Sequence, residues 1–156
     1  MPELGPRGEG WVIGQVVLVV LWLFAPRFER RWPQPLLVVA RLANLVLAAL
    51  GARYFGNGLL CLGGSLTPYP RPKHEALLVT RGVYSQVRHP IYAGITFLLL
   101  GIGMMSGNLA RVILAAIGLL FFDRKATLEE KWLEERFPAY PAYRERVRAR
   151  LLPGIR

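Results

Sequence analysis

Two polar clusters beside apolar segments contain the side chains that could do chemistry in this sequence. The first cluster, residues 81–94, contains Arg88, His89 and Pro90 immediately before an apolar run. Proline favours the first turn of a helix, so we expect a helix to begin here with free backbone N–H groups and the positive end of its dipole. A helix start of this kind can hold an anion or a carboxylate. Taken alone, however, His89 is more typical of a histidine that caps a helix.

The second cluster is the adjacent pair Glu129 and Glu130, which follows the last apolar run. Neighbouring positions do not share a helix face, so we expect one carboxylate to turn toward the polar loop and the other to stay in solvent. The spacing leaves open which of the two turns inward. An acidic pair is by itself most typical of a solvated helix face, and it is the presence of both clusters in one chain that indicates a site.

The segments that must position these clusters are strongly apolar. Apolar residues make up 53% of the 156 residues, and the mean hydropathy is +0.32. They gather in long runs, at residues 11–25, 36–52 and 91–105, instead of recurring at the 3.6-residue period of a soluble amphipathic helix. This pattern disfavours an ordinary soluble domain and predicts an integral membrane protein.

The charge balance is consistent with a membrane location. The chain carries 20 Lys and Arg residues against 10 Asp and Glu residues, a formal net charge of +10. In a soluble protein this excess would suggest nucleic-acid binding, but here the basic residues flank apolar runs, where they set topology and contact anionic lipid headgroups. We therefore expect membrane lipids, and no nucleic acid, as partners. The single Cys61 can form no internal disulfide and lacks the second soft ligand of a metal site, so no metal is expected.

The apolar runs predict an all-α integral membrane helical bundle of about four spans, with five possible. The first span covers residues 10–25, and we expect it to be retained because no basic segment or cleavage site marks it as a signal peptide. The second begins near Leu36 and either ends before Arg53 or continues as one long helix that carries Arg53 toward a pocket; the long helix is favoured. A stripe of small residues should line its contact with a neighbouring helix: Ala48, Ala52 and Gly56.

The second half of the chain predicts a helical hairpin and a polar end. Residues 91–105 and 109–122 form the two arms of the hairpin, after which the pattern becomes amphipathic. The last membrane helix should therefore continue into water until Pro138, and a basic helix should follow at residues 142–150. Residues 67–90, rich in proline and polar residues, should form an ordered loop before the third span.

Four spans would place the N-terminus, the 67–90 loop and the C-terminal tail on one side of the membrane. Nine Lys and Arg residues follow Phe122, whereas the 26–35 loop on the other side carries three arginines. Basic residues are enriched on the cytoplasmic side of membrane proteins. We therefore expect a cytoplasmic or inner membrane protein whose pocket, formed by the loop and the C-terminal helices, faces the cytoplasm.

Together the two clusters resemble the isoprenylcysteine carboxyl methyltransferase and phospholipid methyltransferase group of integral membrane enzymes. The resemblance covers about residues 66–153 and is carried by these positions: Thr67, Pro68, Pro70, Leu78, Val79, Thr80, Gly82, Tyr84, Arg88, His89, Pro90, Tyr92, Gly94, Glu129, Glu130, Tyr140, Tyr143, Val147, Arg150 and Pro153. The Arg-His-Pro-x-Tyr-x-Gly string followed about 35 residues later by Glu-Glu is specific, whereas the N-terminal spans match only in being apolar. Val83 departs from the family, which often has proline at that position.

The resemblance implies one membrane-embedded methyltransferase domain over residues 1–156, with N-terminal spans at residues 1–66 and a catalytic region at residues 67–156. It implies a lipophilic methyl acceptor, either an isoprenylcysteine-like carboxylate or a lipid. It also implies that S-adenosylmethionine binds at the cytoplasmic membrane face, with these residues as candidates for its site: Tyr84, His89, Pro90, Tyr92, Gly94, Glu129 and Glu130. Arg88, Arg148 and Tyr143 are the candidate catalytic residues, and which arginine would orient the acceptor stays open.

Two other classes of function stay open from the sequence. A membrane reductase on a related helical scaffold would bind NADPH, whose 2′-phosphate suits basic residues, although the carboxylates of Glu129 and Glu130 would repel phosphates. A non-enzymatic membrane scaffold would leave the pocket without a catalytic role.

Overall fold

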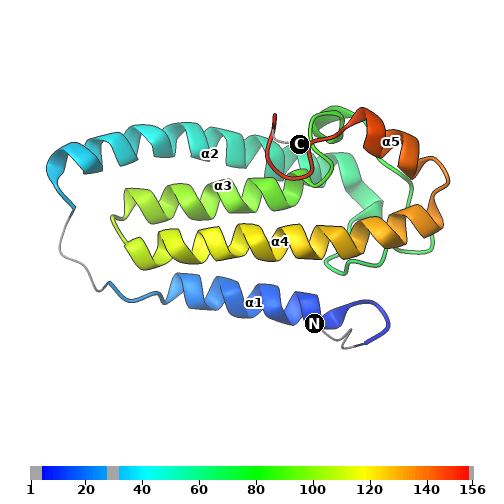
Figure 1. Cartoon of the computed structure of the whole chain (residues 1–156), viewed down its shortest axis with the longest axis horizontal. Coiled ribbons are helices and arrows are strands. Elements are labelled where there is room, and N and C mark those ends of the chain that lie inside the picture. The colour runs from blue at the N-terminus through cyan, green and yellow to red at the C-terminus, as the bar shows by residue number, and fades with distance from the viewer. Residues whose placement is uncertain (1–4, 28–31, 155–156) are drawn as a thin grey trace.

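The apolar runs form helices that lie side by side along one axis (Figure 1). The structure, a computed structural model, describes residues 5–27 and 32–154. Within these residues the secondary structure is entirely helical, as predicted: α1 (Glu9–Leu23), α2 (Gln34–Leu62), η1 (Gly63–Ser65), η2 (Gly82–Ser85), α3 (Pro90–Met105), α4 (Leu109–Arg136) and α5 (Tyr140–Arg146). The long helices pack in the order α2, α3, α4 and α1, with the most extensive contact between α2 and α3.

The polar segments gather at one end of this bundle. The start of α1, the 67–90 loop, the end of α4 and α5 all lie there, whereas the turn between α3 and α4 lies at the opposite end (Figure 1). This is the arrangement expected from four antiparallel helices. Arg30 and Arg31, two of the three arginines in the 26–35 loop, lie outside the described residues.

One described helix, the continuous α2 and η1 segment over Gln34–Ser65, is long and apolar enough to cross a membrane. The apolar helices Glu9–Leu23 and Pro90–Met105 are shorter than a full span. Large apolar side chains nevertheless point outward along the bundle, for example Val39 and Leu45 on α2 and Leu120 on α4, which are 60%, 67% and 69% exposed. Such a surface suits lipid as its surroundings.

The second helix is a single long helix, as favoured from the sequence, because it runs from Gln34 to Leu62 without a break. It does not carry Arg53 into a pocket, so that expectation was wrong. Arg53 is exposed, and its guanidinium donates a hydrogen bond to Gln86 Oε1 at 3.2 Å.

The predicted stripe of small residues on α2 was wrong, because the contact with α3 lies on a different face of the helix. A Cβ added to Gly56 would meet no atom within 4 Å, and Ala52 is exposed. The contact with α3 instead uses Gly51 and Gly58, whose added Cβ atoms would lie 2.7 Å and 2.8 Å from side-chain atoms of that helix. On α3, a Cβ on Gly94 would lie 2.5 Å from a backbone nitrogen of α2. The two helices therefore touch backbone to backbone, which only glycine allows.

The two C-terminal helices have the predicted order but different ends. The helix α4 continues past Phe122 to Arg136 without a break, as predicted. The helix α5 begins at Tyr140 and ends at Arg146, earlier than the predicted end at Arg150. It stops because the following backbone binds elsewhere: the carbonyls of residues 149 and 150 accept hydrogen bonds from the backbone N–H groups of residues 88 and 89, both at 3.0 Å.

Candidate active site

A cavity of about 400 Å³ lies at the polar end of the bundle. Its walls come from the end of α2, the 67–90 loop, the start of α3, the last turns of α4, and α5. Most of the lining is apolar, as in Leu62, Leu78 and Ile95, with a smaller set of polar groups on one side. The volume and this mixture of walls are typical of a site for a small molecule or cofactor.

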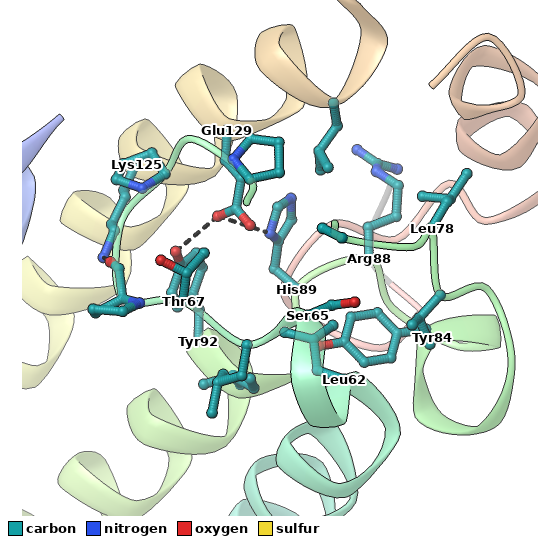
Figure 2. A pocket seen from close by; sticks show the side chains of 18 of the residues that line it. Leu62, Ser65, Thr67, Leu78, Tyr84, Arg88, His89, Tyr92, Lys125 and Glu129 are labelled. Carbon is teal, nitrogen blue, oxygen red and sulfur yellow. Dashed lines mark hydrogen bonds and ion pairs between the residues drawn. The ribbon is translucent and has the colours of Figure 1, made fainter. Parts of the chain in front are cut away.

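His89 lies between the two carboxylates of the acidic pair. Its Nε2 atom is 3.1 Å from Glu130 Oε1, and its Nδ1 atom is 3.7 Å from Glu129 Oε2. The hydroxyl of Tyr92 donates a hydrogen bond to Glu129 Oε2 at 2.7 Å, and the Tyr92 ring stacks on His89 with a centroid distance of 5.6 Å (Figure 2). The expectation that one glutamate stays in solvent was therefore wrong, because the two ring nitrogens of one histidine reach both carboxylates.

The two glutamates have different surroundings. Glu130 has a side chain that is 5% exposed, and it forms an ion pair with Arg88 at 2.8 Å. Glu129 is 25% exposed and lines the cavity, where Figure 2 shows its carboxylate pointing toward Tyr92 and His89. Glu130 is paired with Arg88 behind the cavity wall, whereas the carboxylate of Glu129 faces the cavity.

Arg88 connects α4 to the C-terminal segment. Its Nε atom donates to Glu130, and its Nη1 atom donates to the carbonyls of Val147 and Arg148 at 2.7 Å and 2.8 Å. Both members of the Arg88–Glu130 ion pair are buried. Charge-assisted hydrogen bonds in a dry environment are strong, so this cluster fixes the position of His89 relative to α4.

The surroundings of Glu130 predict a pH-dependent stability. Burial raises the pKa of Glu130, but hydrogen bonds from His89 and Arg88 outweigh burial and lower it from 4.5 to about 2. A carboxyl group with a lowered pKa stabilises the fold above its unfolded pKa, and the contribution is lost as the pH falls through the folded pKa. We expect the free energy of unfolding in detergent to fall by about 2–3 kcal/mol between pH 4.5 and 2. Glu130→Gln should remove that part of the pH dependence. If the free energy of unfolding of Glu130→Gln fell with pH as in the wild type, the prediction would be wrong.

Three tyrosines close the cavity on the side of α5. The hydroxyl of Tyr143 donates a hydrogen bond to the backbone carbonyl of Tyr84 at 2.7 Å, which joins α5 to η2. Tyr140 also lines the cavity, and among the described residues its buried hydroxyl has no hydrogen-bond partner. Burial raises the pKa of Tyr140 well above its ordinary value, so this hydroxyl stays protonated and keeps a hydrogen to donate.

The structure gathers most, but not all, of the predicted site residues at this cavity. Six of them line it: Tyr84, Arg88, His89, Tyr92, Glu129 and Tyr143. Pro90 begins α3 and Gly94 faces α2, so both position the site from behind. Arg148 is exposed and lines a separate groove on the other side of Arg88.

Sequence reasoning missed Lys125 in the cavity wall, together with its partner Gln15 on α1. Lys125 is 1% exposed, and its Nζ atom donates to Gln15 Oε1 at 2.7 Å and to the Pro68 carbonyl at 3.1 Å. The available signal was a lysine placed soon after a long apolar run, where the helix still packs against its neighbours. Long basic side chains near such a boundary usually extend to solvent, so the sequence gives no reason to expect a buried lysine here.

Comparison with known proteins identifies relatives of this chain. Residues 39–139 match the phospholipid methyltransferase family. The chain is 41% identical over 75 residues to the Protein-S-isoprenylcysteine O-methyltransferase of Schizosaccharomyces pombe, an alignment that covers 47% of this chain and 32% of that protein. It is 30% identical over 139 residues to the cobalt-zinc-cadmium resistance protein CzcN of Cupriavidus metallidurans, covering 88% of this chain and 59% of that protein.

A further relative and a solved structure agree with these matches. The chain is 30% identical over 110 residues to the Protein-S-isoprenylcysteine O-methyltransferase B of Arabidopsis thaliana, covering 67% of this chain and 55% of that protein. Its fold matches the eukaryotic intramembrane Ras methyltransferase ICMT with a TM-score of 0.66 at 22% identity, covering 97% of this chain and 55% of that one. The chain thus spans 32–59% of the length of these curated relatives. Because the family match extends over about two thirds of the sequence, the chain belongs to the phospholipid methyltransferase family.

Proposed function

We propose that this protein is an integral membrane methyltransferase that uses S-adenosylmethionine to methylate a lipophilic acceptor on the cytoplasmic side of the membrane. The favoured acceptor is the carboxylate of an isoprenylcysteine-like molecule, because two of the relatives are named for methylation of isoprenylcysteine. The single observation that carries the proposal is the placement of His89 between two carboxylates at the polar wall of a largely apolar cavity.

The cavity residues fit this cofactor chemically. S-adenosylmethionine would supply an electrophilic methyl group on a positively charged sulfur. The Glu129 carboxylate suits the ammonium group or the ribose hydroxyls, and aromatic rings such as that of Tyr92 suit adenine and the sulfonium cation. The unpartnered hydroxyl of Tyr140 offers one more donor to a bound molecule.

The same residues account for catalysis without a nucleophile supplied by the protein. A carboxylate acceptor is already ionised at neutral pH, so the site needs no general base to activate it. What the protein must supply is position and a dry, charged environment. The Arg88–Glu130 pair holds His89 in place, and the apolar walls exclude water from the reacting groups.

Titration calorimetry on the detergent-solubilised protein tests the proposal. We expect S-adenosylhomocysteine to bind saturably and NADPH to give no binding heat, because the Glu129 carboxylate lines the cavity and would repel the phosphates. Labelled S-adenosylmethionine should then transfer its methyl group to S-farnesylcysteine acylated on nitrogen, and not to phosphatidylethanolamine in vesicles. Binding of NADPH alone would support a reductase, and binding of neither would support a scaffold; either result would overturn the proposal.

A further inference from the structure

Lys125 places a buried ammonium group in the cavity wall without a balancing carboxylate. Its two hydrogen-bond acceptors, the Gln15 side chain and the Pro68 carbonyl, are both neutral. Within residues 5–27 and 32–154, no carboxylate forms an ion pair with it. The Tyr92 ring, whose centroid is 5.2 Å from Nζ, also attracts the charge, as does the nearby Glu129 carboxylate, which forms no ion pair with it.

A buried charge without a counter-ion is energetically costly, and hydrogen bonds to neutral groups offset only part of that cost. An ammonium group has three N–H donors, and two of them point to Gln15 and Pro68. The carboxylate of Glu129 lies one turn further along α4, but it is held by Tyr92 and His89. The wall around Lys125 therefore favours an anion inside the cavity.

The other cationic groups near the cavity are already committed or lie elsewhere. Arg88 binds Glu130 and two backbone carbonyls, and Arg148 lines a different groove. Lys125 lies on the opposite side of the cavity from Arg88, with Glu129, His89 and Tyr92 between them (Figure 2). The cavity thus has a negative region that suits a cationic cofactor and, beside it, a positive group that suits an anionic second molecule.

We propose that Lys125 is a specificity-determining residue that binds the carboxylate of the methyl acceptor inside this cavity. The inference rests on the proposed function and adds the residue that selects an anionic acceptor. Gln15 and the Pro68 carbonyl hold the ammonium group in place, and the apolar walls receive the lipophilic part of the acceptor.

The test compares two ligands that differ only in charge: N-acylated S-farnesylcysteine and its carboxamide, bound to the full chain in detergent with S-adenosylhomocysteine present. We expect the wild-type protein to bind the acid at least about tenfold more tightly than the carboxamide. Lys125→Met should reduce this preference to about onefold, and Lys125→Arg should retain it. Equal binding of the two ligands by the wild type, or an unchanged preference in Lys125→Met, would overturn the inference.

Gln15 offers a matched pair of variants that leaves the lysine in place. Gln15→Glu puts a carboxylate beside Nζ and should remove the preference for the acid, whereas Gln15→Leu removes the hydrogen bond but not the charge and should keep it. This pair decides the question even if Lys125→Met does not fold. The opposite pattern would show a structural tether between α1 and α4 and would overturn the proposal.

The pH dependence separates the charge of Lys125 from its packing. Burial lowers the pKa of Lys125 to about 8, although the charge of the nearby Glu129 carboxylate acts to raise it. The other groups that face it are Gln15 on α1, Pro68 in the loop and Tyr92 on α3. The preference for the acid should therefore decline as the pH rises through 8 in the wild type, but not in Lys125→Arg.

Calorimetry with S-adenosylhomocysteine alone keeps this test separate from the proposed function. Saturable binding should persist in all four variants, because none of them replaces a residue proposed to bind the cofactor. Absence of S-adenosylhomocysteine binding to the wild type would refute the methyltransferase proposal itself. Intact binding with no preference for the acid would refute only the role of Lys125.

Discussion

Replacing Arg88 with methionine should lower the free energy of unfolding by about 3 kcal/mol, because the buried Glu130 carboxylate loses its closest cation and keeps only the longer contact with Arg150, at 3.4 Å. The same change removes the donors to the carbonyls of Val147 and Arg148, so the C-terminal segment loses its attachment to the start of α3. Chemical denaturation in detergent, followed by circular dichroism, would measure the difference.

Two further variants make this prediction specific. Arg144 forms an exposed ion pair with Glu134, so Arg144→Met removes the same charge and should cost less than about 1 kcal/mol. In the double variant Arg88→Met with Glu130→Met, no charge is left unpaired in the Arg88–Glu130 pair, and we expect most of the lost stability to return. If Arg88→Met were no more harmful than Arg144→Met, the ion pair would not be the element that holds the site together.

Much of the fold follows from local rules that the sequence displays. Apolar runs and the proline at the start of α3 predict helices whose positions the structure confirms, including the long α2 and the extension of α4 beyond Phe122. Asn108, for example, accepts a hydrogen bond from the backbone N–H of Arg111, as a helix-capping residue does. These features depend on a few neighbouring residues, so they can be predicted without knowing the tertiary structure.

The features that could not be predicted depend on partners distant in sequence. The end of α5 is set by hydrogen bonds from residues 88 and 89, about 60 positions earlier in the chain. The contact face of α2 is set by where α3 fits closest, which Gly51 and Gly58 allow better than the stripe that contains Gly56. The burial of Lys125 depends on Gln15, a residue in a different helix. Spacing alone gives no access to such contacts.

The site shows the same division. The two polar clusters could be found from residue types and spacing, but the different surroundings of Glu129 and Glu130 could not. Both positions are on α4 and differ by one residue, yet one lines the cavity and the other is paired with Arg88. His89 contacts both, so what separates them is the other partner of each: Arg88 pairs with Glu130, and Tyr92 donates to Glu129. Both partners lie far from the pair in sequence, so no local pattern records the difference.

This difference predicts that the same substitution affects ligand affinity at Glu129 but stability at Glu130. Glu129→Gln removes the charge that faces the cavity and should weaken S-adenosylhomocysteine binding by about 1–3 kcal/mol, which is roughly fivefold to more than a hundredfold, with little change in stability. Glu130→Gln leaves Arg88 buried without its carboxylate and should act mainly on the free energy of unfolding. Titration calorimetry and denaturation of the same preparations measure both quantities.

Glu135→Gln is the matched control, because it makes the same change at an exposed position of α4. It should alter neither ligand affinity nor stability by more than about 0.5 kcal/mol. Wild-type affinity in Glu129→Gln would mean that the cavity charge does not contact the cofactor, and the proposed binding role of the acidic pair would then be refuted. A loss of affinity confined to Glu129→Gln would instead assign the contact to the glutamate that lines the cavity and leave its neighbour a structural role.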